Sequence, residues 1–193
     1  LVVLSTAAFG APSSAVGFLR DLHGGLVDRL RTMPVRPGAL LAGRVAGDVL
    51  RIVLIGLLTT SVAMLLGFRF RQGALAAVGF VAVIALFGLM WAAIALWRGS
   101  GPGDEQSLPP SLTGPATLLF IFSSGFVPVS AFPEVVQPVV RANPFSVATE
   151  ALVGLSAGGP VLVPVLQTAA WVVGLGGICL LVALRRYARR TAS

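Results

Sequence analysis

The chain has 193 residues, of which 56% are hydrophobic and only 11% are charged. Its mean hydropathy is +0.93, whereas water-soluble domains carry about 25% charged residues. No long polar stretch interrupts the apolar sequence, so the composition excludes a separate water-soluble catalytic domain. Because backbone polar groups in lipid must pair within the chain, these properties predict an all-α, polytopic membrane bundle.

The net charge of +7 comes from fourteen arginines and no lysine. In a soluble protein such a charge would indicate nucleic-acid binding. Here the arginines lie at the edges of apolar runs, and no aromatic residues alternate with them as stacking platforms. We therefore expect a lipid bilayer, and not nucleic acid, as the surrounding partner. The single cysteine, Cys179, excludes an internal disulfide.

Apolar runs of membrane-spanning length recur along the chain. They cover residues 1–18, 47–67, 74–97, 111–130 and 161–184. The first run begins at Leu1, with neither an initiator methionine nor a preceding basic region. It is therefore expected to be the end of a span in an N-terminally truncated protein, and not a signal peptide.

The arginines divide unequally between the two sides that these spans define. Arg69, Arg71 and Arg141 fall on one side, and the other eleven fall on the opposite side. The positive-inside rule puts the side with eleven arginines in the cytoplasm. The sequence thus predicts a multi-pass protein of the cell membrane with a cytoplasmic C-terminus.

The predicted cytoplasmic segment 19–46 carries a narrow apolar stripe at helical spacing. The stripe consists of Leu19, Leu22, Leu26, Leu30 and Met33. Gly24 and Gly25 predict a corner, followed by a short helix over about 26–33 that Pro34 ends, and a new helix near Gly38. The short helix either rests on the anionic inner leaflet or docks a soluble partner. Acidic residues among its arginines favour docking.

The predicted external segment 131–160 is broken by prolines but is too apolar for an ordinary loop. It predicts two short helices, over 135–140 and 146–155. Asn143 would cap the second helix and Pro144 would occupy its first turn. Residues 68–73 predict a tight turn between two spans, and 98–110 a flexible link. Asp48 and Arg51, three apart on a helix, are expected to pair.

Catalytic and metal-binding patterns are absent from the sequence. His23 is the only histidine, so a histidine-based zinc site or catalytic base is not available. Without lysine, the chain has no phosphate-binding loop of the usual G-x-x-x-x-G-K type. We therefore expect a protein that is not an enzyme, with no catalytic residue, metal or cofactor of its own.

Two stretches resemble the ABC transporter type 2 permease family, and the daunorubicin-resistance branch most closely. The first is GGLVDRLRTMPVRPGALLAGRVAGD over residues 24–48, which is similar to the family's cytoplasmic loop. The second is FSSGFVPVSAFP over 122–133, followed by Asn143-Pro144-Phe145 and Glu150-Ala151-Leu152. Val153 departs from the pattern, because many members carry an arginine there.

The resemblance implies that the chain holds the last five of six membrane helices. It also implies a coupling helix over 27–34 that sits in a cleft of an ATP-binding subunit. The implied interface comprises Leu26, Asp28, Arg29, Leu30, Arg31, Met33 and Pro34. The external helix pair would re-enter the membrane and form an outer gate, with Phe126, Pro128, Pro133, Asn143 and Pro144. A packed plug without substrate contact remains an equal alternative for this external segment.

These implications predict the membrane permease subunit of an ATP-driven exporter for an amphiphilic drug, antibiotic or lipid. A separate ATP-binding-cassette subunit would bind the ATP, and a second permease copy or a paralogue would complete a dimer. The main alternative is a non-transporting anchor or assembly factor that recruits a cytoplasmic partner. A lipid-modifying enzyme is disfavoured, because the sequence offers no acid–base set.

Overall fold

The computed structural model describes residues 1–23 and 37–192, with side chains for 1–22 and 41–189. These residues form helices and no strand, which confirms the predicted all-α class. The helices are α1 (Val2–His23), α3 (Pro37–Leu65), α4 (Gly73–Gly99), α5 (Leu108–Ile121), α6 (Gln137–Ala142), α7 (Pro144–Ala157), α8 (Leu162–Trp171) and α9 (Gly177–Ala192). A 3₁₀ turn, η1 (Val129–Ala131), and a π-helical turn, η2 (Val172–Gly176), complete the set.

Four helical segments within the described residues are long and apolar enough to cross a membrane. They match the predicted spans 1–18, 47–67, 74–97 and 161–184, and each extends beyond its predicted span at one end or both. The predicted span 111–130 differs, because α5 has 14 residues and ends at Ile121. At 1.5 Å per residue it is only about 21 Å long, which is short of a bilayer core. Ser123, Gly125 and Pro128 follow at once and do not favour helix.

Helix α4 lies at the centre of the bundle and packs against α1, α3, α7 and α9. Its contact with α1 is close because α1 presents small buried residues, among them Ala11 and Ala15. A Cβ added at Gly99 would come within 2.6 Å of the Ala15 carbonyl oxygen. In lipid, such close packing of small residues supplies van der Waals energy where a hydrophobic driving force between helices is lacking.

The π-helical turn η2 connects α8 to α9. Together the three elements cover the last predicted span, residues 161–184, apart from its first residue. The turn contains Gly174 and Gly176, and Gly177 follows it. At Gly176 an added Cβ would lie 3.3 Å from the Cα of Met90, so α4 passes close to the turn. The extra residue of a π turn offsets the helix faces on either side of it.

Helix α3 is the least buried of the four candidate spans. Only 11% of its most apolar window is buried, against 56% for α4. Leu50, Leu54, Leu58 and Leu65 are among its exposed side chains. Gly43 and Gly47 have no atom within 4 Å of an added Cβ. The outer face of α3 is thus apolar and is not packed by any other described residue, as expected of a surface that meets lipid or another chain.

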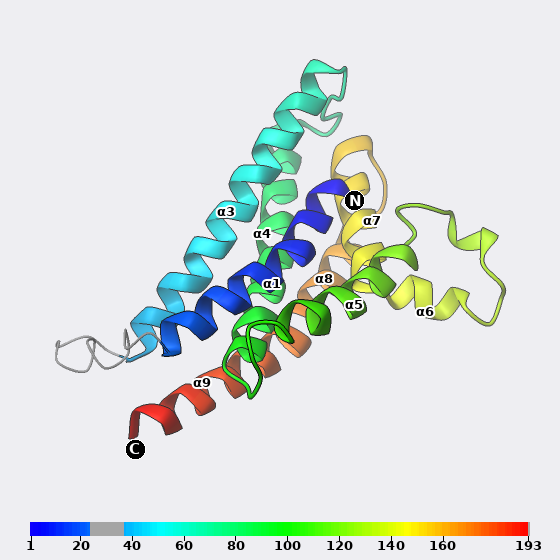
Figure 1. The fold of residues 1–193 in the computed structure, drawn as a ribbon. Helices are drawn as coiled ribbons and strands as arrows, with labels where there is room; N and C mark the ends of the chain where they lie inside the picture. Colours follow the sequence, from blue (N-terminus) through cyan, green and yellow to red (C-terminus); the bar gives the residue numbers. More distant parts are fainter. Residues whose placement is uncertain (24–36, 193) are drawn as a thin grey trace.

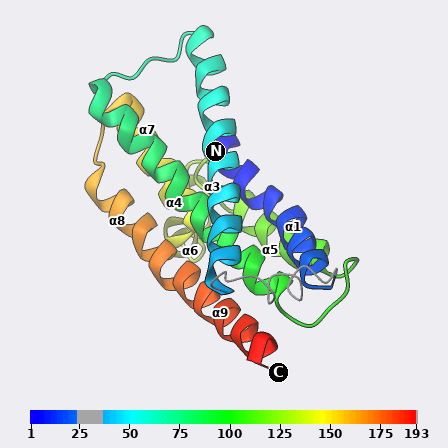
Figure 2. The ribbon, with the colours of Figure 1, turned by 90° about the vertical axis from the view of Figure 1, so that its left-hand side faces the viewer.

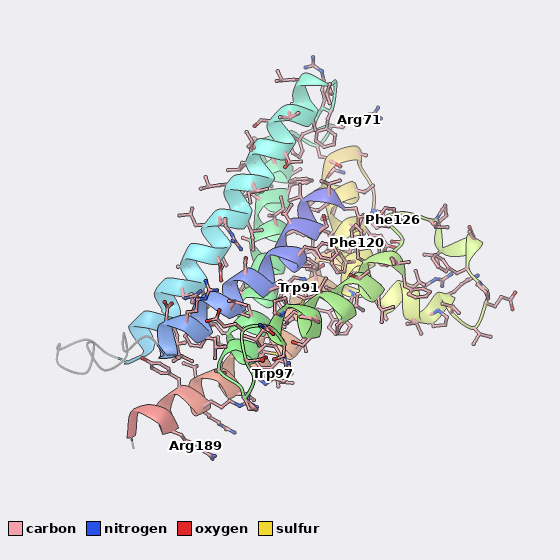
Figure 3. All side chains as sticks on the ribbon, in the orientation of Figure 1. Arg71, Trp91, Trp97, Phe120, Phe126 and Arg189 are labelled. Atoms are coloured by element: carbon pink, nitrogen blue, oxygen red, sulfur yellow. The ribbon has the colours of Figure 1, made fainter. Side chains whose placement is uncertain are left out.

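The two ends of the bundle are distinct in Figures 1 and 2. The C-terminus and the loop between α4 and α5 lie together at one end, which we call the C-terminal end. The α3–α4 turn and the α7–α8 loop lie at the other, which we call the turn end, and the Arg71 N–H donates to the Ser156 carbonyl at 3.0 Å. Figure 3 shows Arg189 and Arg71 at these opposite ends. Arg71 and Arg189, one from each predicted set, therefore lie at opposite ends of the bundle.

Candidate functional site

Asn143 joins α5, α6 and α7 at a single buried point. Its side-chain NH₂ donates to the carbonyl oxygens of Leu119 at 2.6 Å and Phe122 at 2.8 Å. Its side-chain oxygen accepts from the Phe145 N–H at 2.9 Å, which confirms the predicted cap of α7. The end of α5 is thus satisfied by a side chain from another helix, as helix ends buried away from water require.

Aromatic rings surround this point. Phe120 lies 4.7 Å from Phe126 and 5.7 Å from Phe145 between ring centroids, and both pairs meet edge to face. The Trp171 ring N–H donates to the Ala142 carbonyl at 2.9 Å and so joins α8 to the end of α6. Figure 3 shows Phe120 and Phe126 close together beside α7. We call Phe120, Phe126, Asn143 and Phe145 the α5–α7 junction.

The predicted outer-gate residues do not all meet at this junction. Phe126, Asn143 and Pro144 belong to it or adjoin it, and the last two are buried. Pro128 precedes η1, and Pro133 is exposed in the segment that projects from the bundle between α5 and α6 (Figure 1). Helix α7 packs against α4 and α8 with most of its residues buried. Its burial fits a packed structural element at least as well as a moving gate.

Beside α7 lies a cavity of about 470 Å³. Glu150, Thr149 and Val153 of α7 line it, together with Ser124 from the segment after α5 and the glycine-rich start of the α7–α8 loop. Gly158 ends α7 with a φ of 95°, a conformation that favours glycine. The Ser124 hydroxyl donates to Glu150 at 3.4 Å. We call this space the Glu150 cavity.

A second polar feature runs between α1 and α3. Arg44 pairs with Asp21 and also donates to the Ser14 carbonyl at 2.8 Å. The Ser14 hydroxyl donates to Asp48. Asp48 lies 3.7 Å from Arg51, which confirms the predicted pair, and Arg51 reaches the Gly10 carbonyl at 3.4 Å. We call this set the α1–α3 ladder; its members are Gly10, Ser14, Asp21, Arg44, Asp48 and Arg51.

The ladder extends well into the apolar part of the bundle. From Asp21 to Gly10 helix α1 rises about 16 Å, roughly half of a bilayer core. Its two arginines and two aspartates balance in charge, as expected where an unpaired charge would be costly. The Nε atom of Arg44 is buried without a partner. Arg44 also lies against Gly17, where an added Cβ would meet its guanidinium at 2.4 Å.

The loop between α4 and α5 is tied to the end of α1. Arg20 contacts Glu105 at 2.6 Å on the surface. Within the loop, hydrogen bonds from the Ser107 hydroxyl and backbone N–H lower the pKa of Asp104. These contacts position the α4–α5 loop beside the end of α1. Exposed ion pairs of this kind contribute little to the free energy of unfolding.

The predicted partner interface cannot be placed in space. Its residues, from Leu26 to Pro34, lie outside the described residues. Both flanks are described: α1 ends at His23, and α3 begins at Pro37, next to the predicted start at Gly38. The same two helices are joined by the α1–α3 ladder. In the parts of the chain that the structure describes, no group of His, Cys, Asp or Glu side chains could hold a metal ion.

Some residues of these features escaped the sequence analysis. Ser14 and Asp21 were not expected to bond α3, although polar residues near the end of an apolar run are a usable signal. Phe120 carried no signal beyond hydrophobicity, and Phe145 stood in the Asn143-Pro144-Phe145 motif without a role of its own. Glu150 is exposed, and its place beside a cavity depends on the path of the chain after α5.

Comparison with known proteins decides the family. Residues 1–155 match the model of the ABC-2 type transporter family. The chain belongs to this family. Together with the four apolar helices, membership makes it a multi-pass membrane protein, and it confirms the resemblance that the loop and the α5–α7 motifs indicated.

Two relatives place the chain near drug-resistance members of the ABC-2 family. It is 29% identical over 93% of its length to the "Probable doxorubicin resistance ABC transporter permease protein DrrC" of Mycobacterium tuberculosis. It is 36% identical over 68% of its length to a daunorubicin resistance ABC transporter permease protein of Streptomyces coeruleorubidus. The chain spans 64% and 46% of the lengths of these relatives. No solved structure matches it.

Proposed function

We propose that this chain is the transmembrane permease subunit of an ATP-driven exporter that moves an amphiphilic drug, antibiotic or lipid out of the cell. The family match over residues 1–155 carries the proposal, because the matched family consists of transporters. The names of the relatives, which are doxorubicin and daunorubicin resistance permeases, support an amphiphilic cargo. The chain lacks lysine and therefore the usual phosphate loop, so a separate subunit supplies ATP hydrolysis.

Force from that subunit enters through residues 27–34, the proposed coupling helix. These residues connect α1 to α3. The α1–α3 ladder holds the second half of α1 against the first half of α3. A push on the connection therefore moves α1 and α3 as a pair. ATP favours the closed arrangement of the partner subunits, and that differential affinity shifts the permease between its states.

Charge reversal in the coupling helix tests this proposal. The permease is reconstituted in liposomes with a candidate ATP-binding-cassette subunit, and ATP hydrolysis is measured with and without permease. R29E/R31E is expected to weaken docking about tenfold, because reversed charges at an interface repel their former partners. The matched control is R69E/R71E, which makes the same charge change in the α3–α4 turn. Equal ATPase stimulation and transport by R29E/R31E and the unmodified chain would contradict the coupling role.

The proposed orientation, with a cytoplasmic C-terminus, has its own test. The only cysteine is removed by Cys179→Ala, and single cysteines are introduced as Gln106→Cys or Ser130→Cys, both at exposed positions. A membrane-impermeant maleimide added to intact cells is expected to label the cysteine at 130 alone. Labelling at 106 alone would reverse the orientation and remove the coupling helix from the ATP-bearing side.

A non-transporting anchor gives a different outcome in the same experiments. An anchor would bind the ATP-binding subunit but would neither stimulate its ATPase nor move a dye. A transporter does all three. Binding without stimulation or transport, across several lipid compositions and amphiphilic dyes, would favour the anchor.

A further inference from the structure

Glu150 is a carboxylate without a cationic partner. Three of the other described acidic residues are paired with arginine: Asp21, Asp48 and Glu105. Among the described residues, no arginine lies within ion-pair distance of Glu150, whose polar contact is the Ser124 hydroxyl at 3.4 Å. A hydroxyl donor leaves most of the acceptor capacity of an ionised carboxylate unused. Its negative charge therefore remains available to a ligand.

The space beside Glu150 suits a ligand of drug size. The cavity of about 470 Å³ lies within the range of small-molecule sites. Its lining is mostly apolar, with Val129, Val153, Pro160 and Pro164, and its polar side chains are those of Ser124, Thr149 and Glu150. A second cavity of about 330 Å³ shares Thr149 and Val153 with it and reaches Phe68 and Phe80. The two cavities thus adjoin at Thr149 and Val153.

Thr149 supplies an independent sign of an unfilled polar site. Its side chain is only 9% exposed and lines both cavities. Its hydroxyl oxygen is buried and has no hydrogen-bond partner. Buried polar atoms are nearly always paired, and an unpaired one often belongs to a binding site. Thr149 directly precedes Glu150, whose carboxylate has no cationic partner among the described residues.

We infer that the Glu150 cavity binds the ammonium group of an organic cation with an apolar body. Glu150 holds the positive charge, Thr149 accepts a hydrogen bond from an N–H of the ligand, and the apolar lining covers the rest of the molecule. The site lies at the turn end, opposite the α1–α3 ladder. If the chain exports amphiphiles as proposed, a cationic cargo would meet this site near its exit.

A binding experiment tests the site without ATP or a partner subunit. The purified full-length permease in uncharged dodecyl maltoside micelles is titrated with rhodamine 6G, a fluorescent cation, and with Nile red, a neutral dye. Glu150→Gln is expected to lower the affinity for rhodamine 6G about fivefold and to leave that for Nile red unchanged. The matched control is Glu134→Gln, which removes an exposed acid outside the cavity and is expected to change neither affinity.

Val153→Arg provides a second variant, which supplies Glu150 with a cationic partner and leaves its carboxylate in place. Position 153 lines the cavity three residues after Glu150, so an arginine there would pair with the carboxylate. It is expected to abolish the preference for the cationic dye, and thermal unfolding verifies that the protein stays folded. Unchanged rhodamine 6G affinity in Glu150→Gln, or an equal loss for both dyes, would overturn the inference.

A competition experiment distinguishes two sources of the bound ammonium group, a lipid headgroup and a cargo molecule. Phosphatidylethanolamine added to the micelles is expected to displace rhodamine 6G if the natural ligand is a lipid headgroup, and to leave it bound if the ligand is a cargo molecule. Loss of dye binding in Glu150→Gln with normal ATP-driven transport would limit the site to lipid binding. If the permease binds rhodamine 6G with charge selectivity but transports nothing, the exporter proposal is refuted, whereas the proposed binding site at Glu150 still stands.

Discussion

The α1–α3 ladder and the Glu150 cavity both contain acidic side chains, but only the ladder pairs them with arginine. In the ladder, two aspartates and two arginines neutralise one another along about half of a membrane thickness. At the Glu150 cavity, the carboxylate has a hydroxyl neighbour and no cation among the described residues. A paired charge mainly sets which helices stay together, whereas an unpaired charge beside a cavity is available to a ligand.

The comparison extends to how each region holds its helices. The ladder joins two long helices through several charged contacts. The α5–α7 junction instead depends on one neutral side chain, Asn143, that bonds three backbone groups. Loss of a single residue should therefore cost more at the junction than in the ladder.

The largest effect is expected from Asn143→Ala. The change removes the cap of α7 and leaves the Leu119 and Phe122 carbonyls without the donor that Asn143 supplies. Together these losses should cost about 3 kcal/mol of unfolding free energy, measured by denaturant titration in micelles. Asn143→Asp keeps the cap but sets a carboxylate oxygen against the two carbonyl oxygens, so it should cost at least as much as the alanine variant. Near-normal stability of the alanine variant would contradict the role of the junction.

A smaller effect is expected from breaking the Arg44–Asp21 pair. Both side chains are partly exposed, at 21% and 38%, so solvent screens their attraction. A double-mutant cycle with Arg44→Gln and Asp21→Asn should give a coupling of about 1 kcal/mol. A coupling of zero would mean that the pair does not hold α1 to α3, and the ladder would then lose its proposed role in moving the two helices together.

The smallest effect on stability is expected from Glu150→Gln. No cation depends on this carboxylate, so the unfolding free energy should change by less than about 0.5 kcal/mol. The same denaturant titration measures it, with Asp48→Asn as the contrasting variant, because Asp48 accepts from Ser14 and pairs with Arg51. A clear destabilisation by Glu150→Gln would assign Glu150 a structural role and erase the contrast between the two regions.

Local features of the fold could be predicted from the sequence, because they depend on neighbouring residues. Hydropathy gave four spans, proline and glycine marked the start of α3 and the α3–α4 turn, and Asn143 with Pro144 marked the start of α7. The Asp48–Arg51 pair followed from helical spacing alone.

Features that depend on distant partners could not be predicted in the same way. The capping of the end of α5 depends on Asn143, which lies more than twenty residues away and donates to the Leu119 and Phe122 carbonyls. The burial of α7 follows from its packing against α4 and α8, which its mixed composition does not reveal. The Glu150 cavity depends on how the segment after α5 and the α7–α8 loop approach each other.

Transport measured directly in vesicles is the decisive experiment for the proposed function. The permease and its ATP-binding partner are reconstituted so that the nucleotide sites face outward, and rhodamine 6G uptake is followed after ATP is added outside. We expect uptake into the lumen that requires ATP, both subunits and an unmodified Arg29 and Arg31. Uptake that is no greater than with the ATP-binding subunit alone, for rhodamine 6G and for neutral and lipid probes, would contradict the account.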